Sequence, residues 1–336
     1  MLDLVPGALT ELTVRLHELR WLPASTTLVS AESAGDGNMN RTLRVRTNGA
    51  PRTLILKQSV PFVAKYPDIP APIERAAAEA AFYAAIGATP SVEGRTPSLI
   101  GYDAENYLLA FEDLGVGSDQ LVLYQQTTPL DDIDALTKPL IEWLSNLHAI
   151  APPVLENLAM RELNHTHIFE LPLQPDKAIE LGELTDIAAQ FAGNERLKDA
   201  ARELGAIYLG QAPHRSRGVL LHGDFYPGGW LTDSEGATRV IDAEFCFVGP
   251  AEFDVGVMLA HLLFSGVSWE AAEQLGTAYR PPTGFDPKLC RGYAGMEVIR
   301  RLLGIAQLPL TASPAQKMDW LNTAQALVIG HSGYTQ

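Results

Sequence analysis

Two short acidic motifs lie about twenty residues apart in the second half of the chain, each beside an apolar run that predicts a β-strand. The first is His222-Gly223-Asp224, and the second is Ile241-Asp242-Ala243-Glu244-Phe245. Phosphoryl transfer needs one carboxylate beside the attacking hydroxyl and others that hold Mg²⁺ against the phosphates. This stretch contains both kinds. A turn between two strands can also contain Asp, Gly and Pro without such a role, so the chemistry needs support from the rest of the chain.

Each acidic residue of the two motifs suits one part of this chemistry. Asp224 stands in a loop with proline and glycines, where its carboxylate could accept the proton of a substrate hydroxyl. His222 joins it as a catalytic candidate, although bracing the loop suits a lone histidine beside an apolar strand better than acid–base work. Asp242 and Glu244 are two positions apart, so in an extended chain they project to one side and can share Mg²⁺. Apolar residues on both sides weaken the alternative of a surface loop.

A glycine-rich loop at residues 34–40 lies between two predicted strands. Gly35 and Gly37 let the backbone approach a phosphate, and Asn38 follows them with its own N–H group. An ordinary hairpin loop would have the same composition. Lys57 is the one charge in Leu54-Ile55-Leu56-Lys57, which predicts a buried stem and an ammonium group that faces this loop. Such a lysine can bridge nucleotide phosphates, although an edge-strand lysine is also common.

The helix predicted after these strands supplies a partner for the lysine. Residues 73–86 are rich in Ala and Glu and end at a glycine, a pattern typical of a helix. Glu79 lies in its middle, where it can pair with Lys57 and hold the ammonium group toward the phosphates. Glu74 competes for this role, but an acid near a helix start is favoured by the helix dipole alone.

Two further basic residues, Arg300 and Arg301, lie in an otherwise apolar predicted helix. Buried guanidinium groups require anionic or hydroxyl-rich partners. One interpretation pairs one of them with Glu297, three or four residues earlier on the same helix. The other gives both arginines a role in gripping a substrate.

The order of these elements predicts an α+β fold with two lobes. Strand patterns at residues 27–30, 42–46, 53–58, 98–102 and 107–111 predict a five-stranded antiparallel sheet, with a tight two-residue hairpin turn at Asn48-Gly49. We expect an N-terminal lobe over residues 1–112, a hinge over 113–118 and a mainly helical lobe over 119–336. Helices are predicted at residues 9–19, 131–150, 196–209, 254–264, 269–278, 288–303 and 315–328, with short strands near 219–221, 230–231 and 239–241. The pattern of residues 154–193 is weak and is compatible with an insert that covers a substrate.

Composition limits the classes of partner. A net charge of −15 and a pI near 4.9 argue against a nucleic-acid partner, which requires clustered basic residues. Cys246 and Cys290 have no metal-ligand spacing, which argues against a zinc site or a disulfide framework. No signal-peptide pattern and no apolar run of about 18 residues occurs, so we expect a cytoplasmic protein without a membrane partner. A homodimer is left open.

Together the motifs resemble the aminoglycoside phosphotransferase and choline kinase superfamily, which has a protein-kinase-like fold, and within it most of all the 5-methylthioribose kinases. The resemblance covers nearly the whole chain, but its convincing motifs are confined to four stretches, residues 35–40, 56–58, 241–254 and 296–304. It implies ATP and Mg²⁺ as cofactors and a small-molecule hydroxyl acceptor. It also implies Asp224 as catalytic base, Asp242 and Glu244 on the metal, Lys57 on the phosphates, Glu112 and Leu114 near the adenine, and Arg300 and Arg301 on substrate or phosphoryl group.

The chain departs from the superfamily in the loop after Asp224. Most members have a metal-binding Asn five residues after the catalytic Asp, where this chain has Gly229, although methylthioribose kinases also lack that Asn. Tyr226, Pro227 and Trp230 depart from the usual methylthioribose kinase loop. Two alternatives therefore stay open: a kinase for aminoglycosides or other amino alcohols, and a nucleotide-binding pseudokinase that acts as a binding module.

Overall fold

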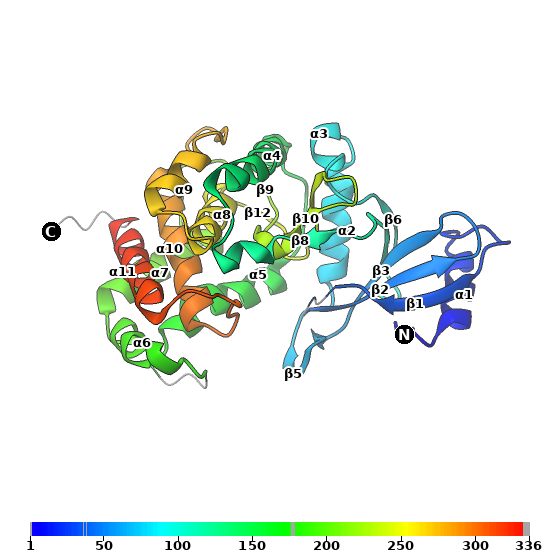
Figure 1. The fold of residues 1–336 in the computed structure, drawn as a ribbon, viewed down its shortest axis with the longest axis horizontal. Coiled ribbons are helices and arrows are strands. Elements are labelled where there is room, and N and C mark those ends of the chain that lie inside the picture. Colours follow the sequence, from blue (N-terminus) through cyan, green and yellow to red (C-terminus); the bar gives the residue numbers. More distant parts are fainter. Residues whose placement is uncertain (1, 36, 38, 176–178, 332–336) are drawn as a thin grey trace.

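The computed structural model describes residues 2–35, 37, 39–175 and 179–331 (Figure 1). Its N-terminal part is a five-stranded antiparallel sheet with the order β1-β2-β3-β7-β6. The strands are β1 (Leu28–Ser33), β2 (Asn40–Thr47), β3 (Thr53–Ser59), β6 (Leu99–Asp103) and β7 (Leu108–Glu112). A small hairpin of β4 (Phe62–Val63) and β5 (Tyr66–Pro70), which the sequence patterns did not predict, follows β3. The predicted sheet is confirmed.

The hairpin between β2 and β3 forms, but the two-residue turn predicted at Asn48-Gly49 is wrong. Arg46 pairs with Thr53, and the N–H of Thr47 donates to the carbonyl of Arg52 at 2.9 Å. The loop is therefore longer than two residues. Neither residue of the Asn48-Gly49 pair has the positive φ that a tight hairpin turn requires.

Alternate residues of the sheet enter two different hydrophobic clusters. Along β7, Leu108 and Ala110 pack with Leu12 and Leu16 of helix α1 (Leu9–Glu18), which covers the outer face. The next residues in β7 belong to the large central cluster, together with side chains of helix α2 (Arg75–Ile86). Figure 1 shows α2 standing between the sheet and the helical part of the chain. One face of α2 therefore belongs to the same core as the C-terminal helices.

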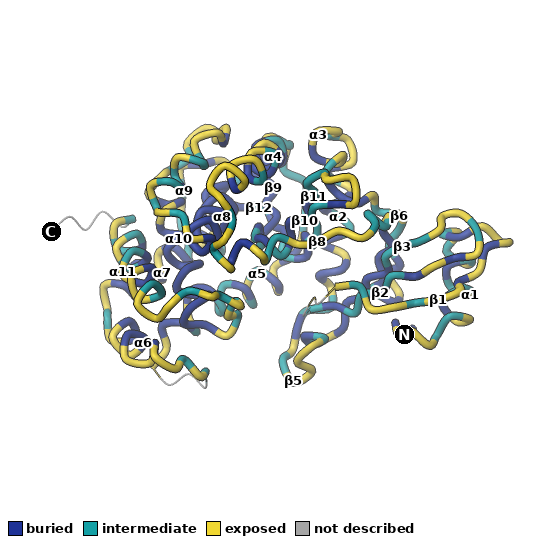
Figure 2. Tube along the Cα trace, viewed as in Figure 1, coloured by how far each residue is buried: buried dark blue, intermediate teal, exposed yellow. Residues whose placement is uncertain are grey.

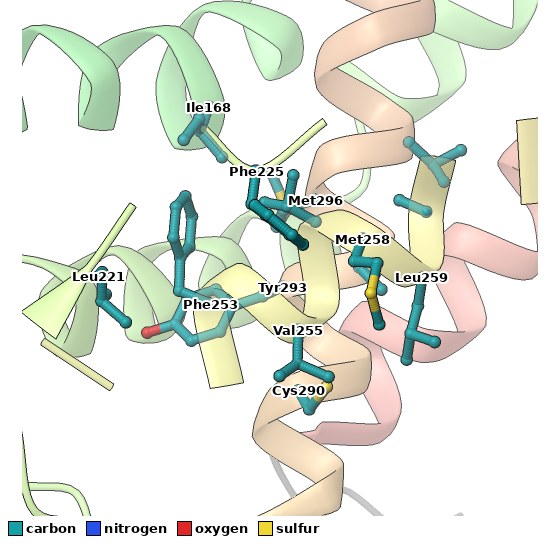
Figure 3. Packing of buried hydrophobic residues seen from close by; sticks show 14 of the residues in the cluster. Ile168, Leu221, Phe225, Phe253, Val255, Met258, Leu259, Cys290, Tyr293 and Met296 are labelled. Carbon is teal, nitrogen blue, oxygen red and sulfur yellow. The ribbon is translucent and has the colours of Figure 1, made fainter. Parts of the chain in front are cut away.

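The C-terminal part is mainly helical, as predicted, and holds most of the buried side chains (Figure 2). Helices α8 (Glu252–Phe264) and α10 (Pro287–Leu303) pack against each other at its centre, and α11 (Pro314–His331) packs on α10. Figure 3 shows Phe253 and Met258 of α8 beside Tyr293 and Met296 of α10. The helices after the short α3 (Pro90–Glu93) are α4 (Leu130–Ala149), α5 (Leu158–His165), α6 (Thr185–Ala192), α7 (Glu195–Tyr208), α8 (Glu252–Phe264), α9 (Trp269–Gly276), α10 (Pro287–Leu303) and α11 (Pro314–His331).

Short strands carry the acidic motifs between these helices. β9 (Val219–Leu221) pairs with β12 (Phe247–Gly249), and β10 (Trp230–Thr232) pairs with β11 (Thr238–Val240) and with β8 (Ser118–Asp119). The pairing of β8 with β10 attaches the end of the expected hinge to the loop that follows Asp224. The sequence predicted β9, β10 and β11 but not β8 or β12.

The weakly patterned segment 154–193 is largely helical over its described residues. It contains α5, the single π-type turn η2 (Thr166–Glu170), η3 (Leu171–Leu173), η4 (Gly182–Leu184) and α6. Ile168, Phe169 and Phe191 lie in the central cluster. Much of the segment therefore belongs to the core of the helical part. Among the described helices, none is both long and apolar enough to cross a membrane.

Candidate active site

Lys57 lies between carboxylates that come from two distant parts of the chain. Its ammonium group donates to Glu79 of α2 at 2.8 Å and also contacts the carboxylate of Asp242. The side chains of Lys57 and Glu79 are almost fully buried, whereas the Asp242 side chain is 45% exposed. The expected pairing of Lys57 with Glu79 is therefore present. Asp242 is the solvent-accessible member of this group of three charged residues.

Electrostatics keep this lysine charged. Burial alone would lower the pKa of Lys57, but Asp242, Glu79 and Glu244 outweigh it and hold the pKa well above its ordinary value. Burial raises the pKa of Glu79 to about 7, against the opposing effect of Lys57. The pKa of Asp242 stays below its ordinary value because Lys57 overcomes the effect of burial. A permanent cation and an ionised, accessible carboxylate thus lie side by side.

The raised pKa of Glu79 predicts a pH dependence of stability. The folded protein keeps this proton up to about pH 7, while an unfolded glutamate loses it near pH 4.5, so stability should fall as pH rises between those values. In the Glu79→Gln variant, we expect the decrease in the free energy of unfolding over this pH range to be smaller by up to about 3 kcal/mol. Urea unfolding at pH 5 and pH 7.5 measures it, with Glu74→Gln, at the exposed position just before α2, as the control. Equal slopes in the wild type and Glu79→Gln would contradict the prediction.

Asp242 and Glu244 do not lie on one side of an extended strand, so that premise of the sequence analysis is wrong. Asp242 has a φ of 71°, in the left-handed region. Its carboxylate turns toward Lys57, whereas the Glu244 side chain is 2% exposed. Oε2 of Glu244 accepts a hydrogen bond from Asn40 and forms an ion pair with Arg75, each at 3.0 Å. The two carboxylates therefore have different surroundings, one accessible and one enclosed.

Arg75, the buried partner of Glu244, was not predicted from the sequence. Its guanidinium group donates to the carbonyls of Met39, Val60 and Pro72 at 2.7–2.9 Å, and it contacts the amide of Asn40. It thereby joins the end of the glycine-rich loop, the end of β3 and the Glu244 segment. A basic residue within the alanine-rich run that begins α2 was the available signal.

Asp224 meets the arginine pair of α10. Nη2 of Arg301 donates to it at 3.0 Å and Nη1 of Arg300 lies 3.5 Å away. Arg301 contacts Glu297 at 2.5 Å and Arg300 contacts it at 3.1 Å, so the expected ion pair with Glu297 is present and involves both arginines. Burial alone would raise the pKa of Glu297, but the two guanidinium groups hold it well below its ordinary value. The two guanidinium groups are thus balanced by Glu297 and by Asp224, the candidate base.

A buried chain of hydrogen bonds supports the arginines from behind. Glu297 lies 3.1 Å from Nε2 of His261, and Nδ1 of that ring lies 2.6 Å from the hydroxyl of Tyr124. Burial lowers the pKa of His261, so the neutral ring donates to the carboxylate and accepts from the tyrosine. Tyr226 covers the guanidinium group of Arg301 at 4.9 Å. His261 and Tyr124 were not predicted from the sequence, because a single histidine in an apolar helix is not distinctive.

The loop that carries Asp224 is held on both sides. Asp254, fully buried at the start of α8, accepts from the backbone N–H groups of His222 and Gly223 at 2.7 and 3.0 Å. Nε2 of His222 donates to the carbonyl of Ile241 at 2.9 Å, which joins the two acidic motifs. Phe225 stacks on Trp143 in the core. His222 thus braces the loop, the part that the sequence favoured for it, and Asp254 is a further positioning residue.

The backbone requires glycine at position 223 and makes a close contact at Gly229. A Cβ on Gly223 would lie 2.0 Å from the carbonyl oxygen of Phe245, and Gly223 has a φ of 85°. At Gly229, a Cβ would lie 3.1 Å from the carbonyl oxygen of Ile241, whose N–H donates to Gly229. A larger residue at position 229 would press on the strand that leads to Asp242. A side chain at position 229 would therefore need Ile241 to shift by a few tenths of an ångström, which does not by itself require glycine.

The remaining predicted nucleotide contacts lie at the rim of the sheet. Gly35 (φ 74°) and Gly37 lie in the loop between β1 and β2, while Asn38 falls outside the described residues. Glu112 ends β7 and accepts from the hydroxyl of Ser98 at 2.9 Å. Leu114 follows in the connection that the Arg44–Asp113 ion pair, at 2.9 Å, attaches to β2. The structure thus places the loop and the connection on the strands that flank Lys57.

The charged groups around Lys57 fit a nucleotide with its metal. A buried ammonium group offers a counter-charge to phosphate, and the exposed carboxylate of Asp242 offers the oxygen that Mg²⁺ prefers. Among the described residues, no group of three or more His, Cys, Asp or Glu side chains could hold a metal by itself. Mg²⁺ usually keeps several waters and binds one or two carboxylates plus phosphate oxygens, so this small donor set is sufficient.

Comparison with known proteins agrees with this arrangement. The chain is 30% identical over 258 residues to a methylthioribose kinase of Bacillus velezensis, which covers 73% of this chain and 63% of that relative. It is 24% identical over 375 aligned positions to a methylthioribose kinase of Bacillus pumilus, covering 97% and 91%. The match to the first relative thus spans less than two thirds of its length.

Solved structures confirm the expected α+β fold. The choline kinase LicA of Streptococcus pneumoniae has a TM-score of 0.56 at 11% identity and covers 96% of this chain and 98% of its own. A spectinomycin phosphotransferase, solved with ADP and spectinomycin, has a TM-score of 0.52 at 12% identity with the same coverage. A family model described as the phosphotransferase enzyme family matches residues 30–296. By this match the chain belongs to the phosphotransferase enzyme family.

Proposed function

We propose that the chain is a small-molecule kinase that transfers the γ-phosphoryl group of ATP to a hydroxyl of a sugar-like metabolite. The observation that carries the proposal is the meeting of three distant segments: Lys57 contacts Glu79 and Asp242, and the Asp242 segment is joined through His222 to the loop of Asp224. A phosphate-binding cation, a metal-binding carboxylate and a candidate base are thus connected. The nucleotide-bound neighbour supports ATP as the donor.

In this proposal each group of the chain has a distinct task. Asp224 takes the proton of the acceptor hydroxyl. The hydroxyl oxygen bonds to the γ-phosphorus of ATP, while the bond between this phosphorus and the oxygen of the departing ADP breaks. Lys57 would hold the phosphates and Asp242 would hold Mg²⁺, and this metal would supply positive charge against the charge that develops on the transferring group. Arg300 and Arg301 orient Asp224 and lie close enough to it to contact the incoming substrate or the transferring group.

Methylthioribose is the leading candidate for the acceptor. Its support comes from the resemblance of the motifs and from relatives that carry the name methylthioribose kinase. The alternative acceptors are aminoglycosides or other amino alcohols, for which the spectinomycin phosphotransferase and choline kinase neighbours provide support at the level of fold alone.

An acceptor panel tests the proposal. In a coupled assay with ATP and Mg²⁺, we expect the release of ADP to depend on an added hydroxyl acceptor. The release should be at least about tenfold faster with methylthioribose than with a polyamino sugar, because a single apolar group changes specificity by this amount or more. The blank contains enzyme and ATP without an acceptor.

Two other outcomes have clear meanings. If polyamino sugars alone respond, the kinase proposal stands and methylthioribose is excluded. If calorimetry detects ATP binding but no acceptor on the panel is phosphorylated, the chain is better described as a nucleotide-binding module, and the kinase proposal fails.

A further inference from the structure

Glu297 sets the orientation of the arginine pair of α10. Its Oε1 accepts from Nε of Arg301 at 2.5 Å, and its Oε2 accepts from Nη1 of Arg300 at 3.1 Å. With Nε held in this way, Arg301 presents Nη2 to Asp224 at 3.0 Å. Because a guanidinium group is a rigid planar fork, a rotation of the Glu297 carboxylate would turn these donors away from Asp224.

His261 holds this carboxylate from the side of α8. Its Nε2 lies 3.1 Å from Oε1 of Glu297, the same oxygen that accepts from Arg301. His261 belongs to α8 and Glu297 to α10, so the contact joins the two central helices. Both side chains are buried, so solvent does not compete for the contact.

The position of the proton on His261 follows from its two neighbours. Glu297 is ionised, because the two guanidinium groups outweigh the effect of burial on its pKa, and an ionised carboxylate can only accept hydrogen bonds. Burial lowers the pKa of His261, so the neutral ring carries its one proton on Nε2. Nδ1 then accepts from the hydroxyl of Tyr124 at 2.6 Å. Tyr124 therefore keeps His261 in the tautomer that donates to Glu297.

The packing around His261 does not by itself require an imidazole. The centre of its ring lies 5.5 Å from the ring of Tyr226 and 5.6 Å from that of Phe264. A leucine would fill much of this space and would suit the aromatic surroundings. The two hydrogen bonds, one to Tyr124 and one to Glu297, are what distinguish histidine from an apolar residue here.

We infer that His261 is a positioning residue of the proposed transfer step: it holds Glu297 in the orientation from which the arginine pair faces Asp224. The inference rests on the proposed function, because it gives the arginine pair a task in that step. Tyr124 acts one step further back, by fixing the tautomer of the ring. Without this support the arginines keep their charge but lose their direction, and a misplacement of this kind lowers a rate by up to about 10²-fold.

Two substitutions at position 261 separate positioning from packing. His261→Leu fills the space without a donor, and we expect it to lower kcat about tenfold or more while calorimetry shows an ATP affinity within about twofold of wild type. His261→Gln keeps a neutral donor for Glu297 and should retain more than about a third of kcat. A packing role predicts the opposite order of the two variants. The matched control is His17→Leu in α1, far from α10 in Figure 1, which should leave kcat within about twofold.

Further variants test whether His261 acts through the arginine pair. In the Arg301→Lys background, His261→Leu should change kcat less than about threefold, because the oriented guanidinium group is already absent. Tyr124→Phe removes a single hydroxyl group and should lower kcat about threefold or more. The melting temperature of each variant shows whether it folds. If His261→Leu does not fold, Tyr124→Phe decides the question, and an unchanged kcat in that variant overturns the inference.

Proton exchange measures the orientation of Arg301 without any activity. NMR of protein with ¹⁵N-labelled arginine follows the exchange of the Arg301 Nε–H group with solvent, and Arg301→Lys identifies its signal. Exchange should be about tenfold faster in His261→Leu than in wild type, and within about threefold of wild type in His261→Gln.

Three results overturn the inference: His261→Leu retains at least as much kcat as His261→Gln, it loses ATP affinity in parallel with kcat, or its Arg301 exchanges at the wild-type rate. If wild-type protein phosphorylates no acceptor, the kinase proposal fails, while proton exchange still decides whether His261 orients Arg301. The two failures are therefore distinguishable.

Discussion

An Asp224→Asn variant should lose about 10³-fold in kcat for the acceptor while it binds ATP with nearly wild-type affinity. Asparagine keeps the volume of the side chain but cannot take the proton of a hydroxyl, and general base catalysis contributes about 10²–10⁴-fold. The nucleotide affinity should persist because Asp224 contacts Arg300 and Arg301, whereas the groups expected on the phosphates, Lys57 and Asp242, contact each other. Steady-state rates and calorimetric titration with ATP measure the two quantities.

The control for this variant is Asp199→Asn, an identical change at an exposed ion pair with Arg202 on α7. It should leave kcat within about twofold, because exposed ion pairs contribute little. If Asp224→Asn keeps more than a tenth of the wild-type kcat, Asp224 is not the base. If it loses ATP affinity in parallel with kcat, its role is to hold the nucleotide site rather than to act on the acceptor.

Much of the fold could be predicted from local patterns. The β-branched and apolar composition of β2, β3 and β7 and the periodicity of α4, α8 and α10 are properties of single segments, and the structure contains these elements. The turn at Asn48-Gly49 was wrong because the pairing of Arg46 with Thr53 sets a longer loop, which local preference does not reveal. β8 was missed because its two polar residues have no strand pattern of their own and its partner β10 is distant in sequence, and β12 was missed although it pairs with the predicted β9. The division into lobes at residues 112 and 119 stays a prediction.

The candidate site was predictable where a residue type is unusual for its element. Lys57 in an apolar strand and the arginines in an apolar helix are such cases, and the structure brings both into ion pairs. Asp254, Arg75 and His261 were missed as site residues because their partners lie far away in sequence, and a single sequence does not show which buried polar groups meet. The φ of Asp242 was likewise unpredictable, since the strand before it favours an extended chain.

Replacing Arg75 with Met should destabilise the protein by about 3–5 kcal/mol, the cost of leaving a buried ion-pair partner uncompensated. Burial lowers the pKa of Arg75, and the charge persists because Glu244 opposes that effect. Methionine keeps most of the stem but leaves Glu244 without its cation and the carbonyls of Met39, Val60 and Pro72 without their donor. Urea unfolding measures the loss. Arg202→Met, at an exposed arginine, should change the free energy of unfolding by less than about 0.5 kcal/mol.

The double variant Arg75→Met with Glu244→Gln decides whether charge or shape causes this loss. A neutral glutamine removes the uncompensated charge, so the double variant should be more stable than Arg75→Met alone, and the cycle of single and double variants measures the coupling between the two residues. If the effects simply add, Arg75 acts through its carbonyl contacts. The Glu244→Gln variant also separates two roles of that carboxylate. If Glu244 binds the metal, the variant should bind ATP more weakly in the presence of Mg²⁺. If Glu244 serves as the counter-ion of Arg75, the variant should have a lower free energy of unfolding and an unchanged affinity for ATP.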